Sequence, residues 1–251
     1  MEGLLLGREG RVATIRIARP PHNFFDLDLL QGIADAIAEA DADDRVVVTL
    51  LSAEGRSFCA GADFTRNQGD ASNASVLYRQ AARIFDRNKL LIAAVGGPAV
   101  GGGLGLALAA DFRVASPATR FHANFAALGL HPGFALTATL PALVGEQRAR
   151  DLLLTARRVR GEEALTIGLV DRLAAPQSLD LEAMMFAQEI AANAPLALAA
   201  IRAALPRIDV EAAYRAMTCE LAEQVKLFVT HDFREGVAAT AARRAPVFLG
   251  N

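Results

Sequence analysis

The chain has 251 residues, of which 53% are hydrophobic and 22% are charged, with a formal net charge of −2. This length is enough for one sizeable core, or for a core with a smaller subdomain. No run of five basic residues occurs, so a nucleic-acid partner is not expected. The two cysteines, Cys59 and Cys219, have neither a C-x-x-C spacing nor companions for a metal site, which favours a reduced compartment and no bound metal.

Strand and helix patterns alternate from the N-terminus. Residues 11–18 predict a strand, and residues 27–40 repeat leucine and isoleucine at helical spacing after Asp26, a predicted N-cap. Their order predicts parallel strands with right-handed crossovers. Further strands are predicted at 45–51, 91–95 and 112–115, and further helices at 74–86 and 103–110. Past residue 180 only helices are predicted, at 181–193, 196–205, 210–229 and 232–244, and no apolar run is long enough to span a membrane.

Two turns made of small residues are the most informative feature of the sequence. Residues 52–63 follow the strand predicted at 45–51, and residues 101–105 follow the strand predicted at 91–95. Glycine and alanine allow backbone and ligand to approach closely, and the helix predicted from Gly103 adds partial positive charge at its N-terminus. The turns therefore predict backbone N–H groups that converge on one oxygen, as in an oxyanion hole.

The motifs around these turns resemble the crotonase superfamily, also called the enoyl-CoA hydratase/isomerase family. The resemblance implies an α/β fold, a spiral of ββα units, over residues 1–190. It implies a helical C-terminal subdomain over residues 191–251 that assembles a homotrimer or a dimer of trimers. With the composition, it implies a cytoplasmic protein. The matching stretches are residues 20–23, 58–63, 94–103, 110–113, 129–133, 168–171 and 232–236, which cover nearly the whole chain.

By this resemblance, the N–H groups of Ala62 and Gly102 hold the carbonyl of an acyl-CoA thioester and stabilise the enolate formed from it. Coenzyme A is expected only as part of the thioester substrate, with no other cofactor, no metal, no nucleic acid and no membrane partner. The residues implied to contact coenzyme A are His22, Asn23, Phe24, Ala60, Ala62, Asp63, Phe64 and Gly102.

Three positions depart from the family pattern. The hydratases carry one catalytic glutamate where this chain has Gly105 and a second where it has Phe125. Related isomerases and dehalogenases carry an aspartate at or beside the position of Gly133. Hydration needs one group to deprotonate water and another to protonate the α-carbon, and neither glycine nor phenylalanine carries a titratable proton. Ordinary hydratase activity is therefore not expected.

His122 and His131 are candidates for the missing acid–base role, because each lies within a few residues of one of these positions. The alternative for each is a structural histidine held by hydrogen bonds. Structural roles are also predicted for Asp63 as a helix cap, and for Asp111 and Asp171 in turns or ion pairs. Weaker catalytic candidates come from the loop and helix over the pocket and from a late helix: Arg66, Asp70, Tyr78, Glu220, Glu223 and Gln224.

One subgroup of the family matches these departures. Residues 121–125, together with residues 129–133, resemble the decarboxylating crotonase homologues of polyketide β-branching, which also place Asn-Phe at the second glutamate position. Loss of CO2 from a 2-glutaconyl-type thioester forms a dienolate without a base, so an oxyanion hole can stabilise its charge directly. Isomerisation or decarboxylation is therefore favoured over hydration. Two alternatives stay open: a binding module that has lost catalysis, and a hydrolase of thioesters or β-diketones.

Overall fold

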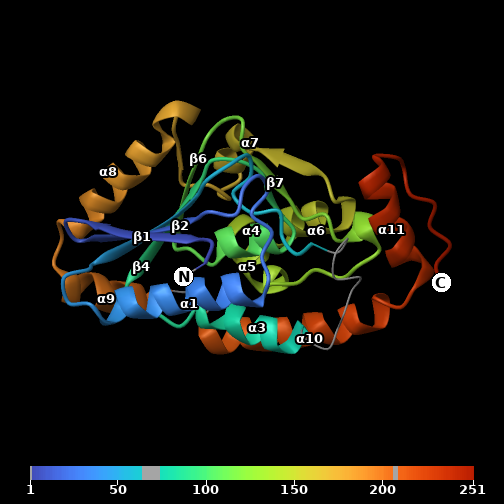
Figure 1. Cartoon of the computed structure of the whole chain (residues 1–251), viewed down its shortest axis with the longest axis horizontal. Coiled ribbons are helices and arrows are strands. Elements are labelled where there is room, and N and C mark those ends of the chain that lie inside the picture. Colours follow the sequence, from blue (N-terminus) through green and yellow to red (C-terminus); the bar gives the residue numbers. More distant parts are fainter. Residues whose placement is uncertain (1, 64–73, 206–208) are drawn as a thin grey trace.

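The computed structural model describes residues 2–63, 74–205 and 209–251, and it contains two sheets (Figure 1). The larger sheet has the strand order β1-β2-β3-β4-β6-β9, and the smaller has the order β5-β7-β8. The strands of the larger sheet are β1 (Leu4–Glu9), β2 (Val12–Ile17), β3 (Val48–Ala53), β4 (Leu90–Val95), β6 (Phe112–Ala115) and β9 (Arg172–Leu173). Those of the smaller are β5 (Ala99–Val100), β7 (Arg120–His122) and β8 (Arg158–Arg160).

The predicted parallel pairing is confirmed from β2 onward. β2 pairs with β3, β3 with β4, β4 with β6 and β6 with β9, all in parallel, while β1 pairs antiparallel with β2. Side chains of β3 alternate between two apolar layers, as the period of a strand requires. Val48 and Leu50 join the cluster that includes α8 (Leu179–Ala191), whereas Leu51 joins the cluster that includes α1 (Leu27–Ala42). Figure 1 shows the sheet between these two helices.

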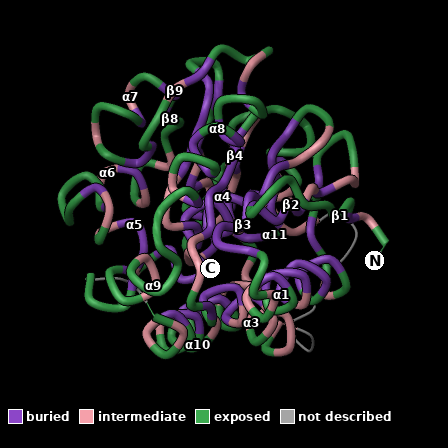
Figure 2. Tube along the Cα trace, turned by 90° about the vertical axis from the view of Figure 1, so that its left-hand side faces the viewer, coloured by how far each residue is buried: buried purple, intermediate pink, exposed green. Residues whose placement is uncertain are grey.

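The chain winds between the two sheets in repeated units. β4 of the larger sheet is followed by β5 of the smaller sheet and then by α4 (Gly102–Leu108). β6 is followed in the same way by β7, by the 3-10 helix η1 (Ala126–Leu128) and by α5 (Leu136–Val144). This is the spiral of ββα units that the resemblance implies. Figure 2 shows α4 buried at the centre of the molecule, and this helix begins at the predicted oxyanion turn.

The predicted helices are confirmed with small shifts of their ends. Asp26 caps α1 and accepts a hydrogen bond from the Leu29 N–H over 2.9 Å, as predicted. The C-terminal helices pack on the core of their own chain, α10 on α3 and α5, and α11 on η1. The remaining helices are α3 (Ala74–Arg83), α6 (Glu146–Thr155), α7 (Gly161–Thr166), the 3-10 helix η2 (Pro176–Ser178), α9 (Pro195–Ala204), α10 (Val210–Leu227) and α11 (His231–Ala242).

Residues 190 and 191 both lie inside α8, so the predicted boundary between core and helical subdomain falls within one helix. The division into two units stays a prediction. Within the described ranges, no single helix combines the length and the apolar composition needed to cross a membrane.

Candidate functional site

The two predicted turns are in contact. Cys59 and Ala99 form a parallel β-bridge, and the Val100 N–H donates to the Cys59 carbonyl over 3.0 Å. Gly61 has a φ of +82°, which favours glycine, and a Cβ there would lie 2.9 Å from the Val100 carbonyl oxygen and 3.3 Å from the Gly102 nitrogen. The chain segment that carries Ala62 therefore packs against the start of α4.

Ala62 and Gly102 present backbone N–H groups at this contact. Gly102 is the first residue of α4, where N–H groups have no partner within the helix. Neither N–H donates a hydrogen bond to another residue in the described part of the chain. Two available donors on touching turns are what stabilisation of a carbonyl oxyanion requires. Their role as an oxyanion hole stays a prediction.

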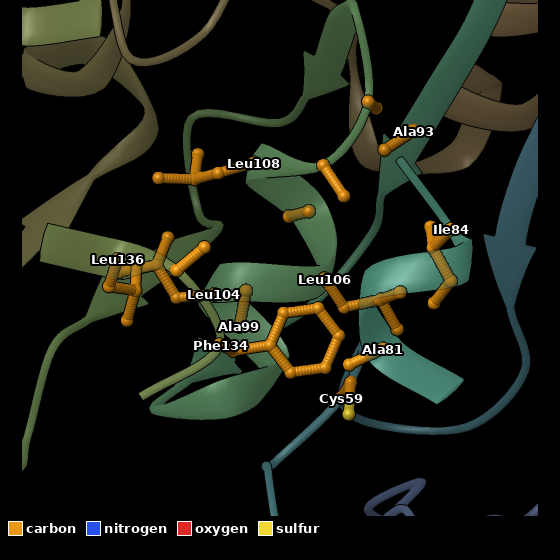
Figure 3. Close-up of a cluster of buried hydrophobic side chains, with 14 of the residues drawn as sticks. Cys59, Ala81, Ile84, Ala93, Ala99, Leu104, Leu106, Leu108, Phe134 and Leu136 are labelled. Atoms are coloured by element: carbon orange, nitrogen blue, oxygen red, sulfur yellow. The ribbon is translucent and has the colours of Figure 1, made fainter. Parts of the chain in front are cut away.

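The space beside Gly105 is filled by a phenyl ring. A Cβ on Gly105 would lie 2.5 Å from Phe134 Cβ and 2.9 Å from Phe134 Cγ, closer than side-chain contacts allow. Phe134 is buried and has a φ of +61°, which is unusual for a bulky residue. Figure 3 shows Phe134 with Leu104 and Leu106 of α4 and with Ala81 of α3, all members of one apolar cluster. Phe125, at the second departure, is buried in the same cluster.

Tyr78 and Gln224 meet at the third departure. A Cβ on Gly133 would lie 2.0 Å from the Tyr78 hydroxyl oxygen and 2.7 Å from Gln224 Nε2. The hydroxyl donates to Gln224 Oε1 over 2.8 Å, and Gln224 Nε2 donates to the His131 carbonyl over 2.9 Å. Burial raises the pKa of Tyr78, and the charge of Glu220 adds to the effect. Two weaker candidates from the sequence are therefore neighbours, although 146 positions separate them in the chain.

Glu220 and Glu223 lie in different environments. Glu220 is 1% exposed and binds the start of α5: Oε2 accepts from the Ala135 N–H over 2.8 Å, and Oε1 accepts from the Thr137 N–H over 2.9 Å. A carboxylate at a helix N-terminus is favoured by the free N–H groups and the helix dipole. Glu223 is exposed and pairs with Lys226 over 2.6 Å. Glu220 is thus a capping residue, and Glu223 belongs to the surface.

Both candidate histidines are held by backbone carbonyls. His122 Nε2 lies 2.8 Å from the Ala156 carbonyl oxygen, and burial, with a contribution from Arg158, lowers the pKa of this histidine. His131 Nδ1 lies 2.8 Å from the carbonyl oxygen of Pro132. These contacts agree with the structural alternative for each residue. The catalytic role of His122 and His131 stays a prediction.

The buried side chain of Asn23 holds in place the segment that is predicted to contact coenzyme A. Its side chain is fully buried, and Nδ2 donates to the carbonyls of Glu54 over 2.6 Å and of Ser57 over 2.8 Å. The flanking side chains of His22 and Phe24 are exposed. Asn23 therefore holds the loop that presents its neighbours, and contact with coenzyme A remains a prediction for all of them.

The other predicted site residues lie along the first turn. Ala60, Ala62 and Asp63 are partly buried. Phe64, Arg66 and Asp70 lie outside the described residues. Cys59 is fully buried, and burial raises the pKa of its thiol to about 12, so it is not a nucleophile near neutral pH.

The predicted ion-pair roles of Asp111 and Asp171 are confirmed. Asp111 binds Arg87 over 2.9 Å and Arg202 over 3.0 Å, and Asp171 binds Arg113 over 2.8 Å.

A cavity of about 440 Å³ lies beside the Asp111 network, between α5, α8 and α9, and none of the predicted site residues lines it. In the described ranges, no group of three or more histidine, cysteine, aspartate or glutamate residues is arranged to hold a metal.

Comparison with known proteins connects this geometry with one family. The sequence matches the family described as Enoyl-CoA hydratase/isomerase over residues 7–251. It is 34% identical to the crotonyl-CoA hydratase of Syntrophomonas wolfei, over 99% of this chain and 98% of the relative. It is 33% identical to the carnitinyl-CoA dehydratase of Salmonella typhi, over 99% of each chain.

Solved structures agree with these sequence relatives. An enoyl-CoA hydratase/isomerase from Pseudoalteromonas atlantica T6c superposes with a TM-score of 0.86 at 31% identity, covering 99% of this chain and 100% of the other. A match of this extent includes both turns, the ββα spiral and the C-terminal helices. The chain therefore belongs to the enoyl-CoA hydratase/isomerase family, with the crotonase fold.

Proposed function

We propose that the protein binds an acyl-CoA thioester through the Ala62 and Gly102 N–H groups, stabilises its enolate, and catalyses decarboxylation or isomerisation rather than hydration. The observation that carries the proposal is the phenyl ring of Phe134 in the space beside Gly105. With Phe125 also buried, both positions at which a hydratase is expected to carry a carboxylate are apolar. Hydration without such groups would lose general acid–base catalysis, which typically contributes about 10² to 10⁴-fold.

The relatives make hydration the competing function, because several of them are named as hydratases. A mass-spectrometric assay of the purified full chain would separate the two functions. The panel would contain crotonyl-CoA for hydration, trans-3-hexenoyl-CoA for isomerisation, and methylmalonyl-CoA and glutaconyl-CoA for loss of CO2. Turnover of at least one of the last three, with little hydration, is expected. Hydration of crotonyl-CoA at a typical enzymatic rate, on the order of 10 s⁻¹ or more, would contradict the proposal.

The same panel addresses the two alternatives. A binding module would bind acyl-CoA in calorimetry without converting any panel member. A thioester hydrolase would release the free thiol of coenzyme A, which a thiol reagent detects. Either result would replace the proposed reaction.

A further inference from the structure

A polar pair lies next to the apolar cluster around Phe134. Tyr78 of α3 donates from its hydroxyl to Gln224 of α10 over 2.8 Å, and the hydroxyl oxygen packs on the backbone of Gly133. The next residue, Phe134, reaches the predicted oxyanion turn, because one ring carbon lies 3.6 Å from the position of a Cβ on Gly102. Two consecutive residues therefore connect the Tyr78 hydroxyl with the Gly102 turn.

The hydrogen-bond network fixes the orientation of this hydroxyl. Gln224 is 3% exposed, and its Nε2 donates to the carbonyls of His131 over 2.9 Å and of Pro132 over 3.3 Å. Since Nε2 faces two acceptors, Oε1 faces Tyr78 and accepts a hydrogen bond from its hydroxyl. Burial and the charge of Glu220 raise the pKa of Tyr78, so the hydroxyl keeps its proton throughout the neutral range.

The other candidate acids for which contacts are described have partners elsewhere. Both carboxylate oxygens of Glu220 accept from the start of α5. His131 Nδ1 lies against the Pro132 carbonyl, and His122 Nε2 lies against the Ala156 carbonyl. Of the two side chains that a Cβ on Gly133 would meet, those of Tyr78 and Gln224, only the phenol is an acid.

We propose that Tyr78 is the proton donor to the enolate, and that the substrate class is an acyl thioester that loses CO2 to form this enolate. The inference rests on the proposed function. When the C–C bond to the carboxylate breaks, its electron pair forms the enolate, whose oxygen accepts from the Ala62 and Gly102 N–H groups. The enolate carbon then takes the proton of Tyr78: the O–H bond breaks, a C–H bond forms, and the thioester carbonyl is restored. The phenolate recovers a proton from water, and no base is needed.

The test is Tyr78→Phe, assayed with methylmalonyl-CoA in D2O. The chain has two tyrosines, so Tyr214→Phe, an exposed position on α10, is a matched control. Tyr78→Phe is expected to lower kcat by about 10²-fold or more with little change in KM. The deuterium in the propionyl-CoA product is expected to lose its stereochemical preference, because solvent then protonates the enolate from either face. Tyr214→Phe is expected to match the unmodified protein in both readouts.

Three failures are distinguishable. If the unmodified protein converts none of trans-3-hexenoyl-CoA, methylmalonyl-CoA and glutaconyl-CoA, the proposed function itself is wrong, and this inference falls with it. If it converts only trans-3-hexenoyl-CoA, the proposed function stands as isomerisation and the substrate class inferred here is overturned. If it converts methylmalonyl-CoA, and folded Tyr78→Phe keeps its kcat and yields one deuterated stereoisomer, only the role of Tyr78 is overturned. Gln224→Leu keeps the hydroxyl but removes the acceptor that orients it. Should Tyr78→Phe not fold, a lower kcat with eroded stereochemistry in Gln224→Leu would support the inference, and unchanged values would overturn it.

Discussion

At the scale of single residues, the N–H of Gly102 can be removed with a steric control. Gly102→Pro and Gly102→Ala both place a Cβ 2.5 Å from the position of Phe25 Cζ, so both displace the same ring. Only proline also deletes the N–H, and proline is tolerated at the first position of a helix. We expect Gly102→Pro to turn over about 10² to 10³-fold more slowly than Gly102→Ala, the usual effect of one oxyanion donor. Equal turnover in the two folded variants would rule out this N–H as a donor.

The contact between Gly105 and Phe134 predicts non-additive stability changes. Gly105→Ala would overpack the cluster and cost about 1–3 kcal/mol, although alanine is otherwise the better residue in a helix. Phe134→Ala would cost about 3–5 kcal/mol by leaving a cavity. In the double variant the new methyl group has room. The double variant's loss of free energy of unfolding, measured by urea denaturation, should therefore be smaller than the sum of the losses in the two single variants. Additive values would mean that the two residues do not share this space.

His122 predicts a pH dependence of stability. Its pKa is lowered in the folded protein, so as pH falls below about 6.5 the unfolded chain takes up this proton first and unfolding is favoured. Above that pH the histidine does not contribute to the change of the free energy of unfolding with pH. His122→Gln keeps an N–H for the Ala156 carbonyl but does not titrate. We expect it to lose less stability than the unmodified protein between pH 8 and about pH 5.5.

Single residues also show how far the sequence predicts the candidate site. The Ala62 and Gly102 turns are local patterns of small residues, and the structure brings them together as expected. That Phe134 fills the space beside Gly105 was not predicted, because it depends on a backbone with positive φ at a residue that rarely adopts it. The Tyr78–Gln224 bond joins helices remote in sequence, and no local pattern encodes such a pairing.

At the scale of elements, long periodic segments were predictable and short ones were not. β5 and β9 have two residues each, too few for a strand period to appear. α5 has no capping side chain at its own N-terminus, because its N-cap residue is Ala135, whose methyl group cannot accept a hydrogen bond. Its cap is Glu220 from α10, far along the chain. A sequence window around α5 therefore contains no start signal of the usual kind.

Because Glu220 of α10 caps α5, removing its buried carboxylate is predicted to have a large effect on stability. Glu220→Ala would leave the Ala135 and Thr137 N–H groups without their acceptor, and we expect a loss of about 2–4 kcal/mol, since unpaired buried groups cost about 1–3 kcal/mol each. Glu220→Gln should cost less because one oxygen can still accept. Glu223→Gln, exposed on the same helix, should change stability by about 0.5 kcal/mol or less. Comparable urea midpoints for Glu220→Ala and Glu223→Gln would contradict the capping role.

At the scale of the whole molecule, Asp111 joins elements that are distant in the sequence. It accepts from Arg87, from Arg202 of α9 and from the Leu91 N–H of β4. Burial opposes its charged form, but the two arginines prevail and hold the pKa of Asp111 below its usual value. Its stabilising contribution is therefore present above pH about 4 and is lost as the pH falls further.

Removing this charge should destabilise the fold as a whole. Asp111→Asn would leave two buried guanidinium groups without a counter-charge, and we expect a loss of about 3–5 kcal/mol. Asp180→Asn is the control, because its pair with Arg16 is exposed and should contribute at most about 1 kcal/mol. Similar denaturation midpoints for both variants would show that the Asp111 network contributes no more to stability than an exposed ion pair.

Phe134 also limits how the predicted site can be altered by stepwise mutation. With the ring in place, glutamate at position 105 has no room even for its first carbon. Shrinking the ring first would open a cavity that costs about 3–5 kcal/mol, a large part of the stability of a typical protein. A library of single substitutions would therefore reject both intermediates before a carboxylate could be selected. Installing a carboxylate at position 105 would therefore require positions 105 and 134 to be randomised together, in a stabilised background.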